Sequence, residues 1–165
     1  FKLGDEPALE DNGYDWDCAY TETDENSASA FVKSGRDKDQ NIYILDVGFG
    51  WKEFPELVKW MKVRGGPHYI EAKASGKSAR QTLQRNGIAA KEVEVDGLDK
   101  ISRTRLATPT AEEGKVFVAQ HLLNVLLDDE RQGILRFPNA SHDDVNDAVV
   151  QAINRHTKKR EFVIG

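Results

Sequence analysis

The sequence has little cysteine or methionine and no long apolar run. Its single cysteine, Cys18, excludes an internal disulfide bond and any metal site built from several cysteines. No apolar stretch approaches the roughly 20 residues of a membrane-spanning helix, and the N-terminus lacks a signal-peptide pattern. We therefore expect no membrane partner and a reducing, cytosolic setting.

An excess of basic charge is also missing. The 165 residues include 23 Lys and Arg against 28 Asp and Glu, which gives a formal net charge of -5. This net charge does not by itself indicate a nucleic-acid-binding protein. It is compatible with one, because a metal site concentrates acids while a separate basic strip contacts phosphates. The length suits one domain with a substantial core. Phe1 is not an initiator methionine, so we expect a fragment or a processed chain.

The spacing of apolar residues predicts a mixed α/β fold. Three early strands with short connections imply an antiparallel meander, and the later alternation of helices and strands indicates a mixed sheet with helices on its faces. The predicted strands are 14–20, 28–34, 41–51, 68–72, 92–95 and 115–118. The predicted helices are 53–63, 77–85, 99–107, 120–130 and the C-terminal part of 138–156. Residues 1–13 are acidic and rich in turn formers, so we interpret them as a linker before a domain of residues 14–165.

The first strand carries two acids on one face. In YDWDCAYT, alternation places Tyr14, Trp16 and Cys18 on one side and Asp15 and Asp17 on the other. A solvent-facing polar side of an antiparallel sheet would explain the acids without any function. The Trp and Phe side chains, like Cys18, are expected in the core rather than as stacking platforms.

A short apolar strand, a small-residue turn and a basic helix follow one another in HYIEAKASGKSARQTLQR. The strand ends on Glu71, and every charged residue after it through Lys91 is basic. A carboxylate at a strand end beside a cationic helix suits metal-assisted chemistry on a phosphate backbone. An ion pair at a sheet edge is the alternative.

The segment EAKASGKS resembles a phosphate-binding loop except at its first position, where Glu71 replaces glycine. That glycine allows backbone N–H groups to approach phosphate, whereas a glutamate adds bulk and negative charge. The apolar strand ending in Asp46 also precedes the loop, which reverses the usual order. An NTPase is therefore disfavoured.

Acids from distant elements could converge at one end of the sheet. Asp17, Glu71 and the pair Asp143–Asp144 could hold two divalent cations about 4 Å apart, and oxygen-only ligands favour Mg²⁺ or Mn²⁺ over zinc. Helix capping from Ser141 is the alternative explanation for the Asp pair, although a helical wheel turns Asp144 toward the buried face. The candidates for supporting polar contacts are Asp24, His142 and Asp147, and Asp15 and Asp46 could be supporting or simply solvated.

Two basic segments border these acids in sequence, residues 73–91 and 100–105. Charge runs usually mark solvated faces, but these two would suit a groove that follows the DNA backbone without reading bases. The residues we expect to contact DNA are Lys73, Lys77, Arg80, Lys100 and Arg103.

Five segments between about Tyr14 and Arg155 carry a family resemblance. They are WDCAYTETDENSASA, IYILDVGFGWKEFPELV, HYIEAKASGKSARQTLQ, DKISRTRLATPTAEEGKVF and LRFPNASHDDVNDAV. Their most specific pieces are the strand-borne Asp17, the E-x-K-x-x-G block at Glu71 and the HDD-x-x-DA run at 142–148. Together they resemble the C-terminal nuclease domain of the large terminase subunit, the genome-packaging motor protein of tailed bacteriophages, which has relatives in herpesviruses.

The resemblance implies a ribonuclease H-like fold and two-metal cleavage of double-stranded DNA. By position, Asp17, Glu71 and Asp143 or Asp144 would be the metal ligands, and Asp24 could be the acid that the family has after its first strand. Some members have Asp where Glu71 stands. The expected reaction is endonucleolytic cutting of concatemeric viral DNA at the start and end of packaging.

The resemblance also implies partners. An intact large subunit has an N-terminal ATPase domain, to which residues 1–13 would connect, and works with a small terminase subunit and a capsid portal in the cytoplasm of the infected host cell. The isolated domain is expected to be monomeric. Two rivals share the fold, a Holliday-junction resolvase and a ribonuclease H, and a third is a DNA- or portal-binding module without catalytic activity.

Overall fold

The computed structural model of the protein is organised around one six-stranded mixed sheet. It describes residues 1–19, 28–71, 74–94, 97–128 and 143–158, with the backbone alone for 74–78 and 128. The strands are β1 (Glu10–Asp17), β2 (Ser29–Arg36), β3 (Ile42–Gly50), β4 (His68–Glu71), β5 (Ala90–Val93) and β6 (Val116–Val118). Their order in the sheet is β5-β4-β1-β2-β3-β6. The strands β1, β2 and β3 pair antiparallel and the other three join in parallel, which confirms the predicted mixed sheet.

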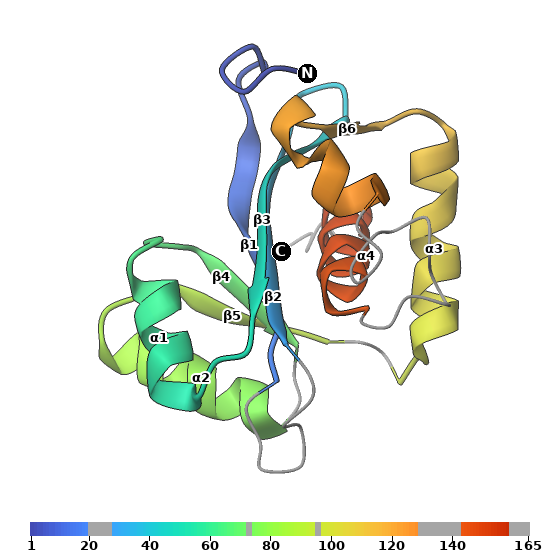
Figure 1. The fold of residues 1–165 in the computed structure, drawn as a ribbon. Helices are drawn as coiled ribbons and strands as arrows, with labels where there is room; N and C mark the ends of the chain where they lie inside the picture. The colour runs from blue at the N-terminus through green and yellow to red at the C-terminus, as the bar shows by residue number, and fades with distance from the viewer. Residues whose placement is uncertain (20–27, 72–73, 95–96, 129–142, 159–165) are drawn as a thin grey trace, which may run out of the picture.

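Helices cover both faces of this sheet. They are α1 (Phe54–Lys62), α2 (Ala74–Arg85), α3 (Lys100–Glu112) and α4 (Asp144–Thr157). Figure 1 shows α1 and α2 on one side of the sheet and α3 and α4 on the other, as the sequence predicts. Within the described residues, no helix is both long enough and apolar enough to cross a bilayer.

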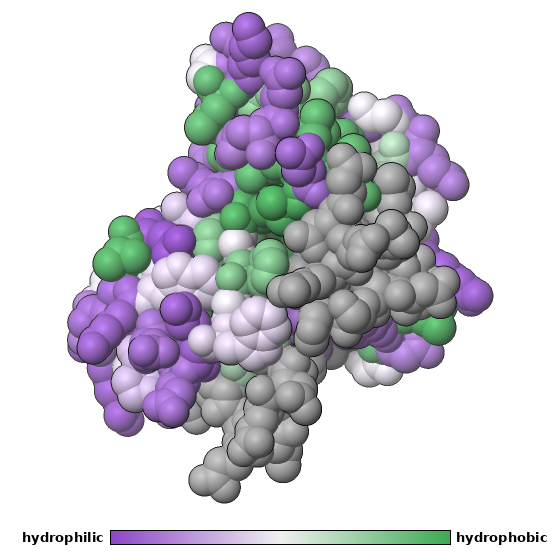
Figure 2. Space-filling model, in the orientation of Figure 1, coloured by the Kyte–Doolittle hydropathy of each residue, from purple (hydrophilic) through white to green (hydrophobic). Residues whose placement is uncertain are grey.

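Each face of the sheet has its own hydrophobic core. Beneath α1 and α2 the core is built on Trp16, Phe31, Leu57 and Leu83, and Cys18 packs partly buried at its margin, as expected for both Trp16 and Cys18. The opposite core contains Ile42, Ile44, Leu126, Val145 and Ile153. Hydrophilic residues cover most of the described surface on the side seen in Figure 2, with a hydrophobic group near its centre.

The neighbouring position of β1 and β4 is important for the site. At Gly13 an added Cβ would stand 2.5 Å from the Tyr69 ring, so this glycine allows the close approach of the two strands. The Tyr14 amide donates to the Pro67 carbonyl at 2.9 Å just before the ladder begins. The two strands then run parallel, with Asp15 opposite Tyr69.

The boundary between the predicted linker and the domain changes. The strand β1 begins at Glu10, so residues 10–13, which we assigned to a linker, belong to the sheet. Ahead of it, the Phe1 ring meets the Tyr43 ring edge-on at 5.3 Å, and the Phe1 amino group donates to the Val118 carbonyl at 3.1 Å. A role of residues 1–9 in joining another domain stays a prediction.

The predicted helix 120–130 is wrong as an α-helix. A 3₁₀ turn (Gln120–Leu122) is followed by a π-helical turn (Asn124–Asp128). The wider π-helical turn does not keep 3.6-residue spacing, so the leucines do not all face inward. Leu122 and Leu126 are buried, whereas Leu123 is 37% exposed. The expectation that Trp and Phe side chains lie in the core fails for Trp51, which is 47% exposed just beyond the end of β3, and for Phe117 of β6, which is 39% exposed.

Candidate metal centre

Two of the predicted ligands, Asp17 and Glu71, are the last residues of adjacent parallel strands. The register of β1 and β4 pairs Trp16 with Ile70, so Asp17 and Glu71 come next on the two strands. Neighbouring strands lie about 4.8 Å apart, which places the two backbones side by side. The sheet therefore brings together two acids that are 54 residues apart in sequence.

Both carboxylates lie on the face covered by α3 and α4. Side chains two residues apart on a strand share a face. Asp15 contacts Arg155 of α4, and the Tyr69 ring lies 4.0 Å from the Arg155 guanidinium carbon. Asp17 and Glu71 follow these residues by two positions and therefore face the same layer.

The start of α4 lies toward the same end of the sheet. Arg155 donates to the Asp11 carbonyl at 3.2 Å, whereas Gln151, one turn earlier in α4, donates to Asp15 and to the Tyr69 carbonyl. The helix α4 therefore runs opposite to β1, and its first residues lie toward the strand ends. Seven residues of helix from Gln151 back to Asp144 cover about 10 Å. Asp144 is 7% exposed, which agrees with the inward orientation that the helical wheel predicts.

The Ser141 cap that the sequence suggests lies outside the described residues. The helix α4 begins at Asp144, and the side chain of Asp143 at the cap position makes no cap hydrogen bond. Asp143 instead accepts a hydrogen bond from Lys100 Nζ at 2.6 Å, and the same nitrogen lies 2.6 Å from Asp147 Oδ2. Burial favours a lower pKa for Lys100, but the contacts with the two acids outweigh it and raise the pKa above its ordinary value. Lys100 is therefore a firmly protonated cation between two carboxylates.

A second cation from α3 lies against Glu71. Arg103 Nη1 is 3.4 Å from Glu71 Oε1, and both side chains are largely buried. Lys100 and Arg103 are three residues apart, so they lie on the same side of the first turn of α3. Asp99 holds the start of this turn, because its side chain accepts the Ser102 amide hydrogen at 2.7 Å.

Asp15 is a buried ion-pair partner, which rules out the solvated alternative and leaves the supporting one as a prediction. It is fully buried, and Arg155 reaches it with Nε at 3.0 Å and Nη2 at 2.8 Å, while Gln151 Nε2 donates to it at 3.2 Å. Burial raises the pKa of the Asp15 carboxyl, and the Arg155 charge opposes this rise. We missed Arg155 and Gln151, because a pairing between residues 140 apart leaves no local pattern in the sequence.

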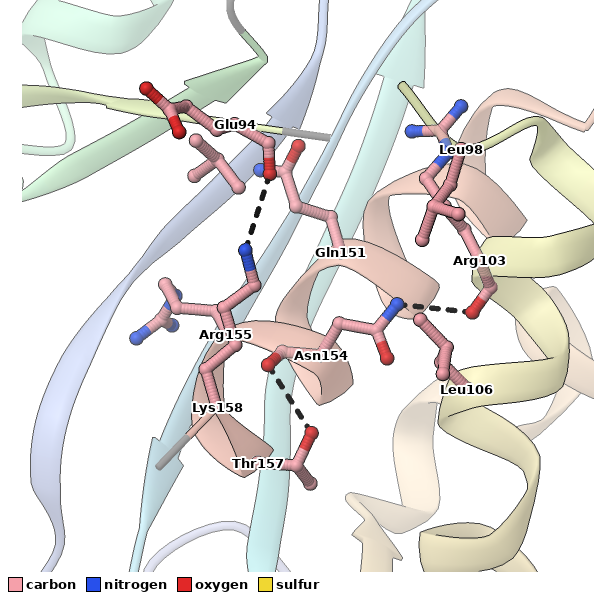
Figure 3. Close-up of a pocket in the computed structure, with 10 residues that line it drawn as sticks. Glu94, Leu98, Arg103, Leu106, Gln151, Asn154, Arg155, Thr157 and Lys158 are labelled. Carbon is pink, nitrogen blue, oxygen red and sulfur yellow. Dashed lines mark hydrogen bonds between the residues drawn. The ribbon is translucent and has the colours of Figure 1, made fainter. Parts of the chain in front are cut away.

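A hollow of about 230 Å³ adjoins this region between β5, α3 and the end of α4. Figure 3 shows Asn154 donating to the backbone carbonyl of Arg103 at 3.0 Å, which joins α4 to α3. Leu98 and Leu106 contribute apolar walls. Arg103 and Arg155 also line this hollow, and their guanidinium groups contact Glu71 and Asp15.

The remaining predicted residues are placed as follows. Arg80 pairs with Glu92 of β5, Nε to Oε1 at 3.1 Å. Asp24, His142 and Lys73 lie outside the described residues, and the side chain of Lys77 is also outside them. DNA contact by Arg80, Lys100 and Arg103 stays a prediction.

The candidate site suits metal ions by the type of its ligand atoms. Its donors are carboxylate oxygens, which suit Mg²⁺ or Mn²⁺, and two protein cations, Lys100 and Arg103, stand among them. In the described part of the chain, no three Asp, Glu, His or Cys side chains form a group that could hold a metal ion. The acids would have to turn from their protein cations toward a metal to ligate it.

No protein-family model and no curated protein matches this chain. Two crystal structures of the large terminase nuclease from the thermophilic phage G20c share its fold, one with bound zinc and one with bound magnesium. The zinc structure is 19% identical and the magnesium structure 16% identical, and each has a TM-score of 0.57. Each match covers 88% of this chain and 82% of the phage chain. The fold of this chain is therefore the α/β fold of a terminase nuclease.

Proposed function

We propose that this chain is a metal-dependent endonuclease domain of a viral DNA-packaging motor. It cleaves concatemeric double-stranded DNA by two-metal phosphodiester hydrolysis when packaging begins and when it ends. The observation that carries the proposal is the placement of Asp17 and Glu71 at adjacent strand ends, on the face where α4 presents its acidic first turn. The likeness to a phage nuclease with bound zinc or magnesium supports it.

The residues that would hold the metal are Asp17, Glu71, Asp144 and Asp143. Two bound Mg²⁺ or Mn²⁺ ions would polarise the scissile phosphate, activate the attacking water and stabilise the leaving oxygen. Asp17 and Glu71 stand on rigid strands, which suits the precise placement that such chemistry needs. The buried Asp15–Arg155 pair holds α4 against β1 and thereby positions Asp144 relative to the ends of β1 and β4.

The basic residues have a separate role in this proposal. Lys73, Lys77 and Arg80 hold the DNA backbone and carry no base preference, because phosphate contacts contain no sequence information. In the full-length protein, an N-terminal ATPase domain, a small terminase subunit and a portal would deliver the DNA. The setting we propose is the cytoplasm of an infected host cell.

Replacement of either strand acid tests the nuclease proposal. We expect Asp17→Asn and Glu71→Gln to reduce plasmid nicking in Mn²⁺ to the level seen with EDTA, because each removes a charged ligand while keeping its shape. Circular dichroism should show an unchanged fold. The matched control is Asp39→Asn, which removes an exposed acid from the β2–β3 turn at the opposite end of the sheet. Nicking that persists in both site variants would remove these residues from the mechanism.

The choice of substrate separates the proposal from its rivals. We expect cleavage of linear duplex DNA by the unmodified chain. Cleavage confined to four-way junctions or to RNA–DNA hybrids would overturn the packaging role in favour of a resolvase or a ribonuclease H. Binding of DNA without cleavage in either Mg²⁺ or Mn²⁺ would indicate a module that has lost its catalytic activity.

A further inference from the structure

The candidate metal centre contains two positive charges of its own, and both come from one helical turn. Lys100 Nζ lies 2.6 Å from Asp143 Oδ2 and 2.6 Å from Asp147 Oδ2. Arg103 Nη1 lies 3.4 Å from Glu71 Oε1. A single turn of α3 therefore contacts acids of both β4 and α4.

This turn is held in place from two sides. The Asp99 side chain accepts the Ser102 amide hydrogen at the start of the helix, and the Asn154 side chain donates to the Arg103 carbonyl at 3.0 Å. Apolar burial adds little here, because Ile101 and Leu106 are both more than half exposed and Ala107 is the buried apolar residue of α3. The polar contacts with the acids are thus a large part of what docks the beginning of α3.

The acids need such partners. Carboxylates held close together and partly desolvated repel one another, and without cations they protonate or turn apart. Burial raises the pKa of Asp147, and the charge of Lys100 opposes that rise. A divalent cation would offer the same acids two positive charges at one point. It therefore competes with Lys100 for the same oxygens.

We propose that Lys100 and Arg103 are built-in counter-ions of the candidate metal centre, where they position the acids before metal binds, and that a divalent cation displaces Lys100 from Asp143. This inference rests on the proposed function, because it requires that the site binds a divalent metal ion. Displacement frees the Lys100 ammonium group, a cation that can then contact a DNA phosphate. Metal binding and the docking of α3 are then linked, so each weakens the other.

Metal titration of the full chain without DNA tests the proposal. We expect Lys100→Met to bind Mn²⁺ about tenfold more tightly than the unmodified chain, since one competing cation is gone while the aliphatic stem remains. Lys100→Gln should shift affinity in the same direction, and Lys100→Arg should restore nearly the original value. The matched control is Arg105→Met, which removes an exposed charge from the same helix and should leave the affinity almost unchanged.

Thermal unfolding gives a second readout that does not depend on catalysis. Without metal, Lys100→Met should unfold at a lower temperature than the Arg105→Met control, and Mn²⁺ should raise its unfolding temperature by more than it raises that of the unmodified chain. Equal Mn²⁺ affinity in Lys100→Met, Lys100→Gln and Arg105→Met would overturn the counter-ion role alone. Absence of Mn²⁺ binding in the unmodified chain and in every variant would overturn the proposed function, and this inference with it.

Discussion

Two buried histidines, His68 and His156, lie on opposite faces of the sheet. Trp16 Nε1 donates to His68 Nδ1 at 3.0 Å, and burial lowers the pKa of His68 to about 4. His156 Nε2 lies 2.9 Å from Ser34 Oγ, and burial together with the charges of Arg155 and Arg36 lowers its pKa to about 3. Both side chains are therefore neutral in the folded protein at physiological pH.

We expect the free energy of unfolding to fall as the pH is lowered from about 6.5 toward 4. In this pH range a histidine of the unfolded chain is protonated whereas the buried histidine of the folded chain is not. The free energy of unfolding therefore falls by up to about 1.4 kcal/mol per pH unit for each histidine. The total for His68 is at most about 3 kcal/mol. Urea unfolding at several pH values measures the slope. It should become shallower in His68→Gln and stay unchanged in His121→Gln, whose histidine is exposed; an equal slope in both variants would contradict this account.

At the scale of the element, α4 is attached to the sheet by charge as well as by apolar contact. Val145, Ala148, Ala152 and Ile153 face the core. Near its C-terminal end, Arg155 holds the fully buried Asp15 of β1. The helix thus has an apolar attachment along its length and a polar one that sets its register on the strand.

Removal of one partner of this pair should be costly. We expect Arg155→Met to lower the free energy of unfolding by about 3–5 kcal/mol, because it leaves a buried carboxylate without its counter-ion. The double variant with Asp15→Asn should recover part of the loss, since no buried charge then remains. Denaturant unfolding provides the measurement, and the exposed Arg85→Met is the control. A loss in Arg155→Met no larger than in this control would show that the pair contributes little.

At the scale of the whole molecule, one sheet separates two cores. The strand β2 contributes side chains to both, Ala30 and Val32 to one core and Phe31 to the other, so neither core can form without it. The buried Trp16 and the partly buried Trp60 belong to the core beneath α1 and α2. The third tryptophan, Trp51, contacts Phe49 at the margin of the other core. In a Trp51→Phe background the fluorescence of Trp16 and Trp60 therefore reports the core beneath α1 and α2, whereas far-ultraviolet circular dichroism reports the whole chain.

We expect the two cores to unfold in one transition. Leu83→Ala on one face and Ile153→Ala on the other should each lower the free energy of unfolding by about 2–5 kcal/mol. In both variants the fluorescence and circular dichroism midpoints should move together, because the shared strand β2 couples the two faces. A fluorescence midpoint that stays in place in Ile153→Ala would show instead that the two cores unfold separately.

Local patterns determined the elements and much of the candidate site. Alternation in the first strand put Trp16 and Asp15 on opposite faces, and the apolar run before Glu71 placed that acid at a strand end. Both features depend on residues a few positions apart, so they can be predicted from the sequence. The helical wheel likewise turned Asp144 inward, as its burial bears out.

The partners of each charge were decided by the tertiary structure alone. Nothing near Asp15 in the sequence indicates Arg155, and nothing in the basic segment 100–105 indicates that Lys100 and Arg103 turn toward acids. The parallel pairing of β1 with β4 likewise joins strands that lie far apart in the chain. Local spacing sets which face a side chain occupies, but the packing of distant elements sets which group it meets there, and for a charged residue that meeting determines both its energy and its role.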